Sequence, residues 1–309
     1  MFAMEHRSLG SLRVSVVGLG CNNFGARLDE RATTAVVDAA LDAGVTFFDT
    51  ADVYGATQSE VLLGRALGAR RASVVVATKF GMPIDAEHAG ARPEYVRAAC
   101  EDSLRRLGTD YIDLYQLHYP DDTVPLAETL GALAELVAAG TVREIGCSNF
   151  TADQLRDAHA IAGDGPGFAS VQNQYSLLAR EPESDGVLEA CAELGVGFLP
   201  FYPLANGLLT GAFRPGEPLG EGTRHAKMAP ERSVHWLSDS FQRRVSTLLD
   251  VATSVDTPML TLAFSWLLSR TVVSSVIAGA STPEQIRANA AAATTLDGAT
   301  VAQLSSLTT

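Results

Sequence analysis

Four side chains of this sequence could together deliver a proton: Asp49, Tyr54, Lys79 and His118. A free tyrosine has a pKa near ~10, so at neutral pH it is protonated but a weak acid. A lysine ammonium beside it stabilises the phenolate and lowers that pKa. We therefore expect Lys79 to make Tyr54 a better proton donor, with Asp49 holding Lys79 charged and oriented. His118 would hydrogen-bond the oxygen that receives the proton and so orient the substrate.

This set of side chains suits one kind of chemistry. An oxygen receives the proton as it gains negative charge, which happens when hydride arrives on the carbon bonded to it. No protein side chain supplies a hydride. The chemistry therefore requires a nicotinamide cofactor.

The elements that must position these residues alternate along the chain. Short β-branched runs predict strands over 16–20, 45–49, 74–78, 112–118, 145–148, 170–174, 197–201 and 275–278. Amphipathic runs rich in Ala and Leu predict helices over 30–43, 59–67, 93–107, 126–139, 152–161, 187–194, 240–255 and 259–268. Strands separated by helices of this length predict βαβ units and a parallel α/β sheet. Eight such units fit either a closed barrel or a large doubly wound sheet.

Glycines mark the ends of four of the predicted helices, namely Gly44, Gly108, Gly140 and Gly195. Each stands where a residue with positive φ stops a helix. Residues 7–14 are expected to form a small hairpin that closes one end of a barrel. The chain has 309 residues and no linker-like stretch, which fits a single barrel domain over residues 1–309.

A barrel places its active residues at the carboxyl ends of its strands. Polar and aromatic residues stand at these ends in consecutive strands: Asp49 with Tyr54 in the following loop, then Lys79, His118, Ser148 with Asn149, Gln172, and Phe201. Burying such groups without partners is costly, so we expect them to face one another around a ligand.

Several segments resemble the aldo-keto reductase family in its motif order. GVTFFDTADVYG at 44–55 resembles the signature around the catalytic Asp and Tyr, and ATKF at 77–80 and DLYQLH at 113–118 resemble the lysine and histidine strands. The resemblance runs from about residue 7 to 293. It implies a (β/α)8 TIM barrel with an N-terminal hairpin and extra C-terminal helices. It also implies an NAD(P)H-dependent oxidoreductase acting on CH–OH groups, which reduces an aldehyde, ketone or sugar carbonyl or runs in reverse.

The resemblance further implies the residues that bind the cofactor. IGCSNF at 145–150 is similar to the family segment whose Ser and Asn hold the nicotinamide carboxamide, here Ser148 and Asn149. Gln172 matches the glutamine that does the same. PFYPL at 200–204 places Phe201 against the nicotinamide ring and includes Leu204. GASTPEQIRAN at 279–289 resembles the segment that binds the adenosine end, which implies Gly279, Ser281, Gln285 and Asn289.

The last of these segments also predicts a capped helix. Thr282 or Ser281 would cap it, Pro283 would stand in its first turn, and Glu284 or Gln285 would complete a capping box. A helix N-terminus binds phosphate through its free N–H groups. Family members often carry Lys or Arg near position 281 for the 2′-phosphate of NADP, but here the nearest cation is Arg287. NADP is the expected cofactor and NAD the alternative.

Composition excludes other classes of protein. The net charge of −13 argues against nucleic-acid binding and weakly against an anionic membrane surface. The four cysteines are far apart, which disfavours a metal or disulfide framework. The N-terminus lacks an apolar run of signal-peptide length, and residues 259–268 are too short to span a bilayer and predict a buried helix. We expect a cytoplasmic protein with a small-molecule partner, and the sequence makes no prediction of oligomeric state.

Three alternatives compete with this interpretation. Gly18 and Gly20 begin a dinucleotide fingerprint, but Asn23 stands where its third glycine belongs, so a Rossmann site is rejected. A Schiff-base lyase using Lys79 would leave Tyr54 without a role. A non-enzymatic NADP(H)-binding regulatory or redox-sensing barrel would bind cofactor without turning over any carbonyl.

Substrate selection is expected from the loops near 25–29, 81–91 and 204–238. Four aromatic residues are predicted to form a rim around the site, namely Phe24, Phe80, Tyr119 and Tyr202.

Overall fold

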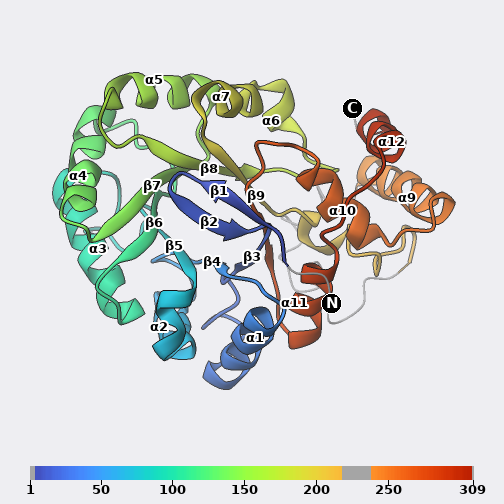
Figure 1. Ribbon diagram of the computed structural model, residues 1–309, viewed down its shortest axis with the longest axis horizontal. Helices are drawn as coiled ribbons and strands as arrows, with labels where there is room; N and C mark the ends of the chain where they lie inside the picture. Colours follow the sequence, from blue (N-terminus) through green and yellow to red (C-terminus); the bar gives the residue numbers. More distant parts are fainter. Residues whose placement is uncertain (1–3, 218–237, 308–309) are drawn as a thin grey trace.

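A computed structural model describes residues 4–217 and 238–307 of the chain. Its centre is an eight-stranded parallel sheet in the order β10-β3-β4-β5-β6-β7-β8-β9, ringed by helices (Figure 1). The strands are β3 (Val17–Gly20), β4 (Phe47–Asp49), β5 (Val75–Phe80), β6 (Ile112–Leu117), β7 (Val142–Ser148), β8 (Phe168–Gln174), β9 (Gly197–Phe201) and β10 (Val276–Gly279).

The sheet curls until its two edges meet. Beside β9, the backbone N–H of Phe198 donates to the carbonyl of Val272 at 2.7 Å, and the N–H of Ser274 donates back to Phe198 at 3.0 Å. Residues 272–274 lead directly into β10, so these bonds bring the first and last strands of the sheet together. The protein is therefore a (β/α)8 barrel, which decides between the two predicted architectures.

Helices follow the strands in the predicted alternation. They are α1 (Glu30–Asp42), α2 (Gln58–Leu67), α3 (Pro93–Leu107), α4 (Leu126–Ala138), α5 (Ala152–Ala162), α6 (Glu181–Ser184), α7 (Val187–Leu194), α9 (Asp239–Ser254), α10 (Met259–Leu268), α11 (Pro283–Ala291) and α12 (Gly298–Leu307), with short 3-10 turns η1 (Gly68–Ser73) and η2 (Ala205–Gly207). The predicted helices agree with these bounds to within one residue. Helix α11 follows β10 as the helix of the eighth unit and packs against α1, whereas α12 is an additional C-terminal helix that packs against α9.

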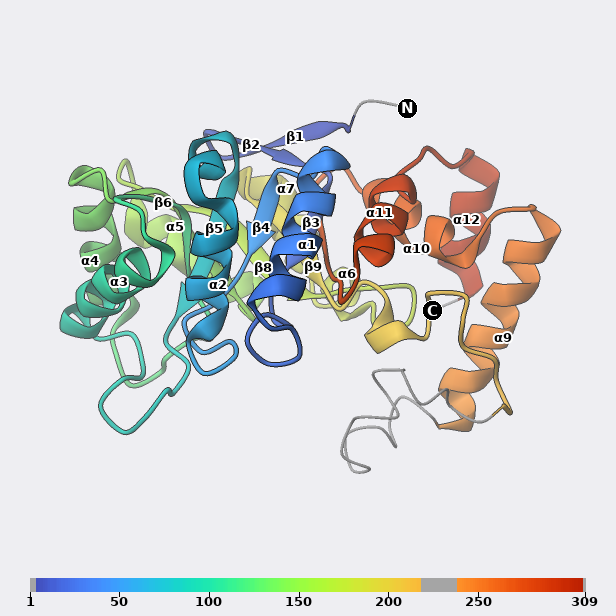
Figure 2. The same cartoon turned by 90° about the horizontal axis from the view of Figure 1, so that it is seen from below.

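An N-terminal hairpin closes one end of the barrel, as predicted. It pairs β1 (His6–Leu9) with β2 (Leu12–Ser15) in antiparallel register. Leu9, Leu12 and Val14 are buried in a cluster with side chains of the barrel strands, including Phe47 and Val75 at the starts of β4 and β5. Figure 2 shows the hairpin across one end of the barrel. The hairpin therefore covers the amino ends of the strands and leaves their carboxyl ends uncovered.

The glycines at the helix ends have the expected conformation. Gly44, Gly108, Gly140 and Gly195 all have positive φ, between +64° and +80°. This region is sterically open to glycine but rarely adopted by other residues. Each glycine therefore ends its helix and turns the chain toward the next strand.

Strand β5 is longer than its sequence predicted. The prediction ended it at Thr78, whereas the ladder continues through Phe80, with Lys79 paired to Gln116 of β6. A charged residue usually marks the end of a buried strand because burial of an unpaired charge is costly. Lys79 has partners inside the barrel, and this removes the penalty.

Helix α10 is a buried element of the fold, as predicted. Eight of its ten residues are buried, Leu262 and Trp266 among them. No single helix in residues 4–217 and 238–307 is long and apolar enough to cross a membrane, although α9 and α10 pass that test as a pair bent by 95°.

The cysteines are all free, and each is buried. Within the part of the chain that the structure describes, no group of three or more His, Cys, Asp or Glu side chains is placed to hold a metal ion.

Candidate active site

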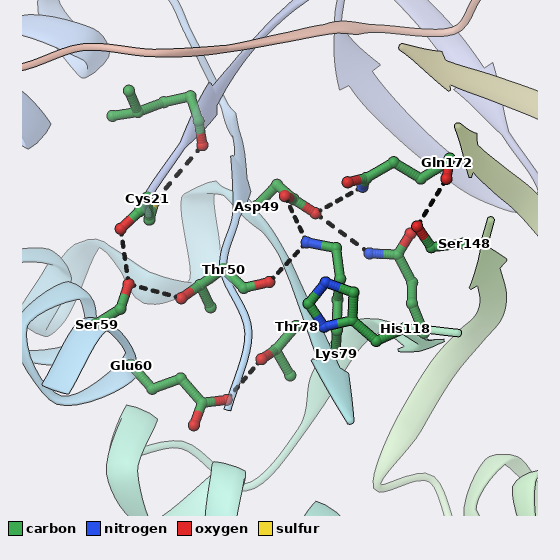
Figure 3. Close-up of polar contacts among 12 residues, drawn as sticks. Cys21, Asp49, Thr50, Ser59, Glu60, Thr78, Lys79, His118, Ser148 and Gln172 are labelled. Atoms are coloured by element: carbon green, nitrogen blue, oxygen red, sulfur yellow. Dashed lines mark hydrogen bonds and ion pairs between the residues drawn. The ribbon is translucent and has the colours of Figure 1, made fainter. Parts of the chain in front are cut away.

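A buried ion pair lies at the carboxyl ends of β4 and β5. Lys79 is fully buried, and its Nζ donates to Asp49 Oδ2 at 2.6 Å and to the carbonyl of Thr50 at 2.9 Å. Asp49 is itself only 2% exposed. Figure 3 shows the ammonium between these two acceptors. The sequence-predicted pairing of Asp49 with Lys79 is present in this geometry.

The second oxygen of the Asp49 carboxylate is also satisfied. Gln172 Nε2 donates to Oδ1 at 2.9 Å, and Gln116 Nε2 donates to it at 3.2 Å. Gln116 is not among the residues predicted for the site. One feature of the sequence could have indicated it: Gln116 is an amide near the apolar end of a buried strand. It lies opposite Lys79 of the neighbouring strand β5.

Tyr54 lies over this pair from the loop between β4 and α2. Lys79 Nζ is 5.2 Å from the centroid of the Tyr54 ring. The ring of His118, from the end of β6, meets Tyr54 edge-on with centroids 5.8 Å apart. The four residues predicted to act together thus form a chain of contacts, from Asp49 through Lys79 and Tyr54 to His118.

The loop that carries Tyr54 is fixed to the strands on both sides. The backbone N–H of Asp52 donates to the carbonyl of Lys79 at 3.0 Å. The Thr50 and Ser59 hydroxyls lie 2.8 Å apart, and Ser59 Oγ donates to the carbonyl of Cys21 at 2.9 Å. Several bonds from different strands therefore hold the tyrosine in one place, which favours precise chemistry.

Burial dominates the acidity of the tyrosine. It raises the pKa of Tyr54 above the usual value near ~10, whereas the charge of Lys79 and its hydrogen bond to the phenol lower it. Lys79 therefore acts in the expected direction, but burial outweighs its effect on the Tyr54 pKa. Burial lowers the pKa of Lys79, but Asp49 and Tyr54 together raise it above its ordinary value, so the ammonium stays charged.

His118 is a neutral imidazole in this site. Burial, followed by the charge of Lys79, lowers the pKa of His118 to about 3. Its Nδ1 is buried and has no hydrogen-bond partner among the described residues. A neutral imidazole can donate one hydrogen bond without adding a second positive charge beside Lys79.

Three of the residues expected to hold the carboxamide are joined at the ends of β7 and β8. Ser148 and Gln172 are paired in register, and Ser148 Oγ donates to the Gln172 carbonyl at 2.7 Å. Asn149 has φ +61° and its Nδ2 donates to Ser148 Oγ and to the His118 carbonyl, each at 3.0 Å. Gln172 and Asn149 therefore contact Asp49 and His118 directly.

The loop after β9 has an unusual backbone. Phe201 is half-buried and meets the ring of Tyr202 edge-on at 5.2 Å. Leu204 precedes Ala205 and Asn206, and both of these have positive φ, at +46° and +57°. Asn206 Oδ1 is buried without a partner among the described residues. Non-glycine residues in this region are strained and cluster at ligand sites.

The remaining cofactor candidates lie around α11. Thr282 is the N-cap, as predicted, and its Oγ1 accepts from the N–H of Gln285 at 3.3 Å. Gln285 Oε1 accepts from the N–H of Ser281 at 2.7 Å. Side-chain oxygens therefore accept from the N–H groups of Ser281 and Gln285 in this structure. Gly279 ends β10 and is exposed, whereas Asn289 is buried in α11.

Comparison with known proteins agrees with this arrangement. Residues 16–308 match the Aldo/keto reductase family. The chain belongs to this family.

Two aldo/keto reductases illustrate the likeness. The chain is 42% identical over 207 residues to a protein named probable aldo-keto reductase 1 of Glycine max, a match that covers 64% of this chain and 58% of that relative. It resembles the structure of an aldo-keto reductase from Bacillus halodurans in its holo form, with a TM-score of 0.82 and 32% identity over 98% of this chain and 96% of that one.

The rim of the site in this aldo/keto reductase differs from the prediction. Phe24 and Phe80 are fully buried in the main core, and Phe80 stacks on Tyr115 with centroids 4.6 Å apart. They pack outside the strands instead of facing a ligand. Tyr119 and Tyr202 are exposed, and Tyr119 stacks on His118 at 5.6 Å. Of the loop predicted at 204–238, residues 218–237 lie outside the described residues.

Proposed function

We propose that this aldo/keto reductase transfers hydride between a nicotinamide cofactor and a small-molecule carbonyl. It reduces an aldehyde, ketone or sugar carbonyl to the alcohol, or runs in reverse. The observation that carries the proposal is the fully buried Lys79–Asp49 pair against the ring of Tyr54, with neutral His118 at its edge.

Tyr54 is the proton donor in this proposal. As the carbonyl oxygen gains negative charge, the Tyr54 hydroxyl gives it a proton. Phenolate forms where the Lys79 ammonium already lies, in a site that excludes water and strengthens their attraction. Neutral His118 donates a hydrogen bond to the same oxygen and orients the carbonyl.

The residues at the strand ends fit a nicotinamide cofactor, which would supply the hydride. Ser148, Asn149 and Gln172 carry the amide and hydroxyl groups that match a carboxamide, and Phe201 offers a ring face. The Oδ1 atoms of Asn22 and Asn206 have no partner in residues 4–217 and 238–307, and a polar ligand would satisfy these two acceptors.

The adenosine end is assigned to Gly279, Ser281, Gln285 and Asn289, with Leu204 on the facing loop. We propose NADP as the cofactor and NAD as the alternative. Arg287 on α11 is exposed and is the cation nearest in sequence to Ser281, so the 2′-phosphate has fewer charged partners than in relatives with a basic residue there.

Replacing the proton donor tests the proposal. Tyr54→Phe should lower kcat/KM for carbonyl reduction about 10²- to 10⁴-fold because it removes the acid. The Kd of NADPH should stay within about twofold, since the ring is kept. Turnover of a panel of aldehydes, ketones and sugars is followed by cofactor absorbance, and cofactor binding by fluorescence.

Tyr95→Phe is the matched control. Tyr95 is buried on α3, and its hydroxyl has no partner among the described residues, so its loss should leave kcat/KM unchanged. Near-normal turnover by Tyr54→Phe would overturn the mechanism. Tight NADPH binding by the unmodified protein with no turnover of any carbonyl would instead support the redox-sensing barrel.

A further inference from the structure

Gln116 has no role in the mechanism proposed above, yet its side chain is fully buried among the reacting groups. It lies in β6 with 0% exposure. Its Nε2 donates to Asp49 Oδ1 at 3.2 Å, and its Oε1 is buried without a hydrogen-bond partner among the described residues. This amide therefore makes one side-chain hydrogen bond there, and that bond goes to Asp49.

A buried amide with one unsatisfied oxygen is an expensive choice for a barrel interior. Leaving such an acceptor unpaired costs about 1–3 kcal/mol, whereas a leucine or methionine would fill the same space without that cost. The Nε2 must face the carboxylate, because Oε1 in its place would set a lone pair against a negative charge. The single bond to Asp49 is what distinguishes glutamine from an apolar residue here.

The donors on Asp49 come from three different strands. Lys79 on β5 binds Oδ2, while Gln116 on β6 and Gln172 on β8 bind Oδ1. Lys79 and Gln116 are register partners, so they reach the carboxylate from the same level of the barrel. With donors on both oxygens from different directions, the carboxylate cannot rotate away from Lys79.

The two glutamines differ in what else they bind. In the proposed function, the Gln172 amide binds both Asp49 and the cofactor carboxamide. The Gln116 amide hydrogen-bonds only to Asp49 among the described residues. We propose that Gln116 is a positioning residue that fixes the Asp49 carboxylate and thereby holds the Lys79 ammonium against Tyr54. This inference rests on the proposed function for its effect on turnover, but its geometric part can be tested without substrate or cofactor.

Lysine NMR gives that independent test. The chain contains only two lysines, Lys79 and Lys227. Protein labelled with 13C-lysine therefore gives two Cε signals, which Lys227→Arg assigns. In Gln116→Met, which keeps the length of the side chain but removes the donor, the Lys79 Cε signal should shift and its two Hε protons should become more nearly equivalent.

Turnover and its pH dependence give the second test. Gln116→Met should lower kcat about tenfold or more, with KM for carbonyl and cofactor within about twofold. Gln116→Glu keeps the shape of the side chain but donates to Asp49 only when the new carboxyl is protonated. The side chain at position 116 contacts Asp49 directly. Through Asp49 it is linked to the other titratable groups of the site, Lys79, Tyr54 and His118. The activity of Gln116→Glu should fall as pH rises, a profile that a packing defect would not produce.

Ser170→Ala is the matched control. Ser170 is a fully buried polar residue of β8 whose Oγ has no partner among the described residues, so its loss perturbs the barrel without touching Asp49. Unchanged Lys79 signals and kcat within twofold in both Gln116 variants would overturn the proposal. If the unmodified protein reduces no carbonyl, the proposed function fails, while the Lys79 signals still decide whether Gln116 positions Asp49.

Discussion

At the scale of single residues, the site is built around two charges that water does not reach. Lys79 and Asp49 are 0% and 2% exposed. A buried ion pair adds little stability by itself, but removing one partner leaves the other charge uncompensated. Every additional bond on Asp49 or Lys79 therefore serves placement of charge more than stability. Burying the two charges adds little to the stability of the fold, but it places the Lys79 ammonium at a fixed distance from Tyr54.

The pKa of His118 leads to a prediction about reduction rates. Because burial and Lys79 lower the pKa of His118 to about 3, its imidazole is neutral at every pH from 5 to 9. The Tyr54 pKa is raised, so its hydroxyl is protonated over the same range. We expect kcat/KM for reduction to be flat from about pH 5 to 9, with a loss only at higher pH where Tyr54 ionises.

Initial rates at saturating cofactor across this range test the expectation. A limb with a midpoint near 6.5 that disappears in His118→Gln would show that an imidazolium takes part, contrary to the assignment. His118→Gln, which keeps a neutral donor, should leave the same flat profile at a rate reduced about tenfold or more.

At the scale of elements, the sequence predicted where polar groups meet but not how deeply each one is buried. Strand alternation and helix-ending glycines predicted eight βα units but left a closed barrel and a doubly wound sheet both open, and only the resemblance to aldo-keto reductases implied the barrel. The contact between Gln116 and Asp49 joins residues 67 positions apart, and nothing local in either strand indicates it. The same holds for Phe24, which was placed on the rim but packs in the core. Which face of a barrel loop points inward is set by tertiary packing.

The N-terminus of α11, which the proposed function assigns to the adenosine end, allows a test of cofactor preference. Gln285 is exposed, and its side chain occupies the Ser281 N–H. Gln285→Arg frees that N–H and adds a guanidinium suited to phosphate. We expect the Kd of NADPH to fall about tenfold relative to that of NADH, as measured by fluorescence titration of both cofactors.

Gln303→Arg is the control for added charge. It introduces the same side chain at an exposed position of α12, so it should leave the ratio of the two dissociation constants unchanged. An equal effect of Gln285→Arg on NADPH and NADH would show that α11 does not meet the 2′-phosphate.

At the scale of the whole molecule, the two ends of the barrel have different tasks. The hairpin seals one end with apolar side chains, and Phe47, Val75 and Leu114 complete that plug. The opposite end gathers buried polar groups, several of which have no hydrogen-bond partner among the described residues. Such groups can weaken the fold when they become charged.

Asp52 is such a group. It follows β4 in the loop of Tyr54, is 0% exposed, and neither carboxyl oxygen has a partner among the described residues. Burial, and next the charge of Glu60, raise the pKa of Asp52 to about 7. The folded protein therefore keeps this proton where an unfolded chain, with a carboxyl pKa near ~4, has lost it.

It follows that the protein should lose stability as pH rises from about 4 to 7. The raised pKa corresponds to a loss of at most about 4 kcal/mol in the free energy of unfolding. The whole of this loss is present above pH 7. Asp52→Asn removes this ionisation, so its gain in unfolding midpoint over the unmodified protein should be small at pH 4.5 and grow to several degrees at pH 8. Asp38→Asn, which removes an exposed carboxylate paired with Arg70, should show no such growing gain. Parallel melting curves for Asp52→Asn and the unmodified protein at both pH values would mean that Asp52 is charged in the folded state, compensated by neighbours such as Arg106.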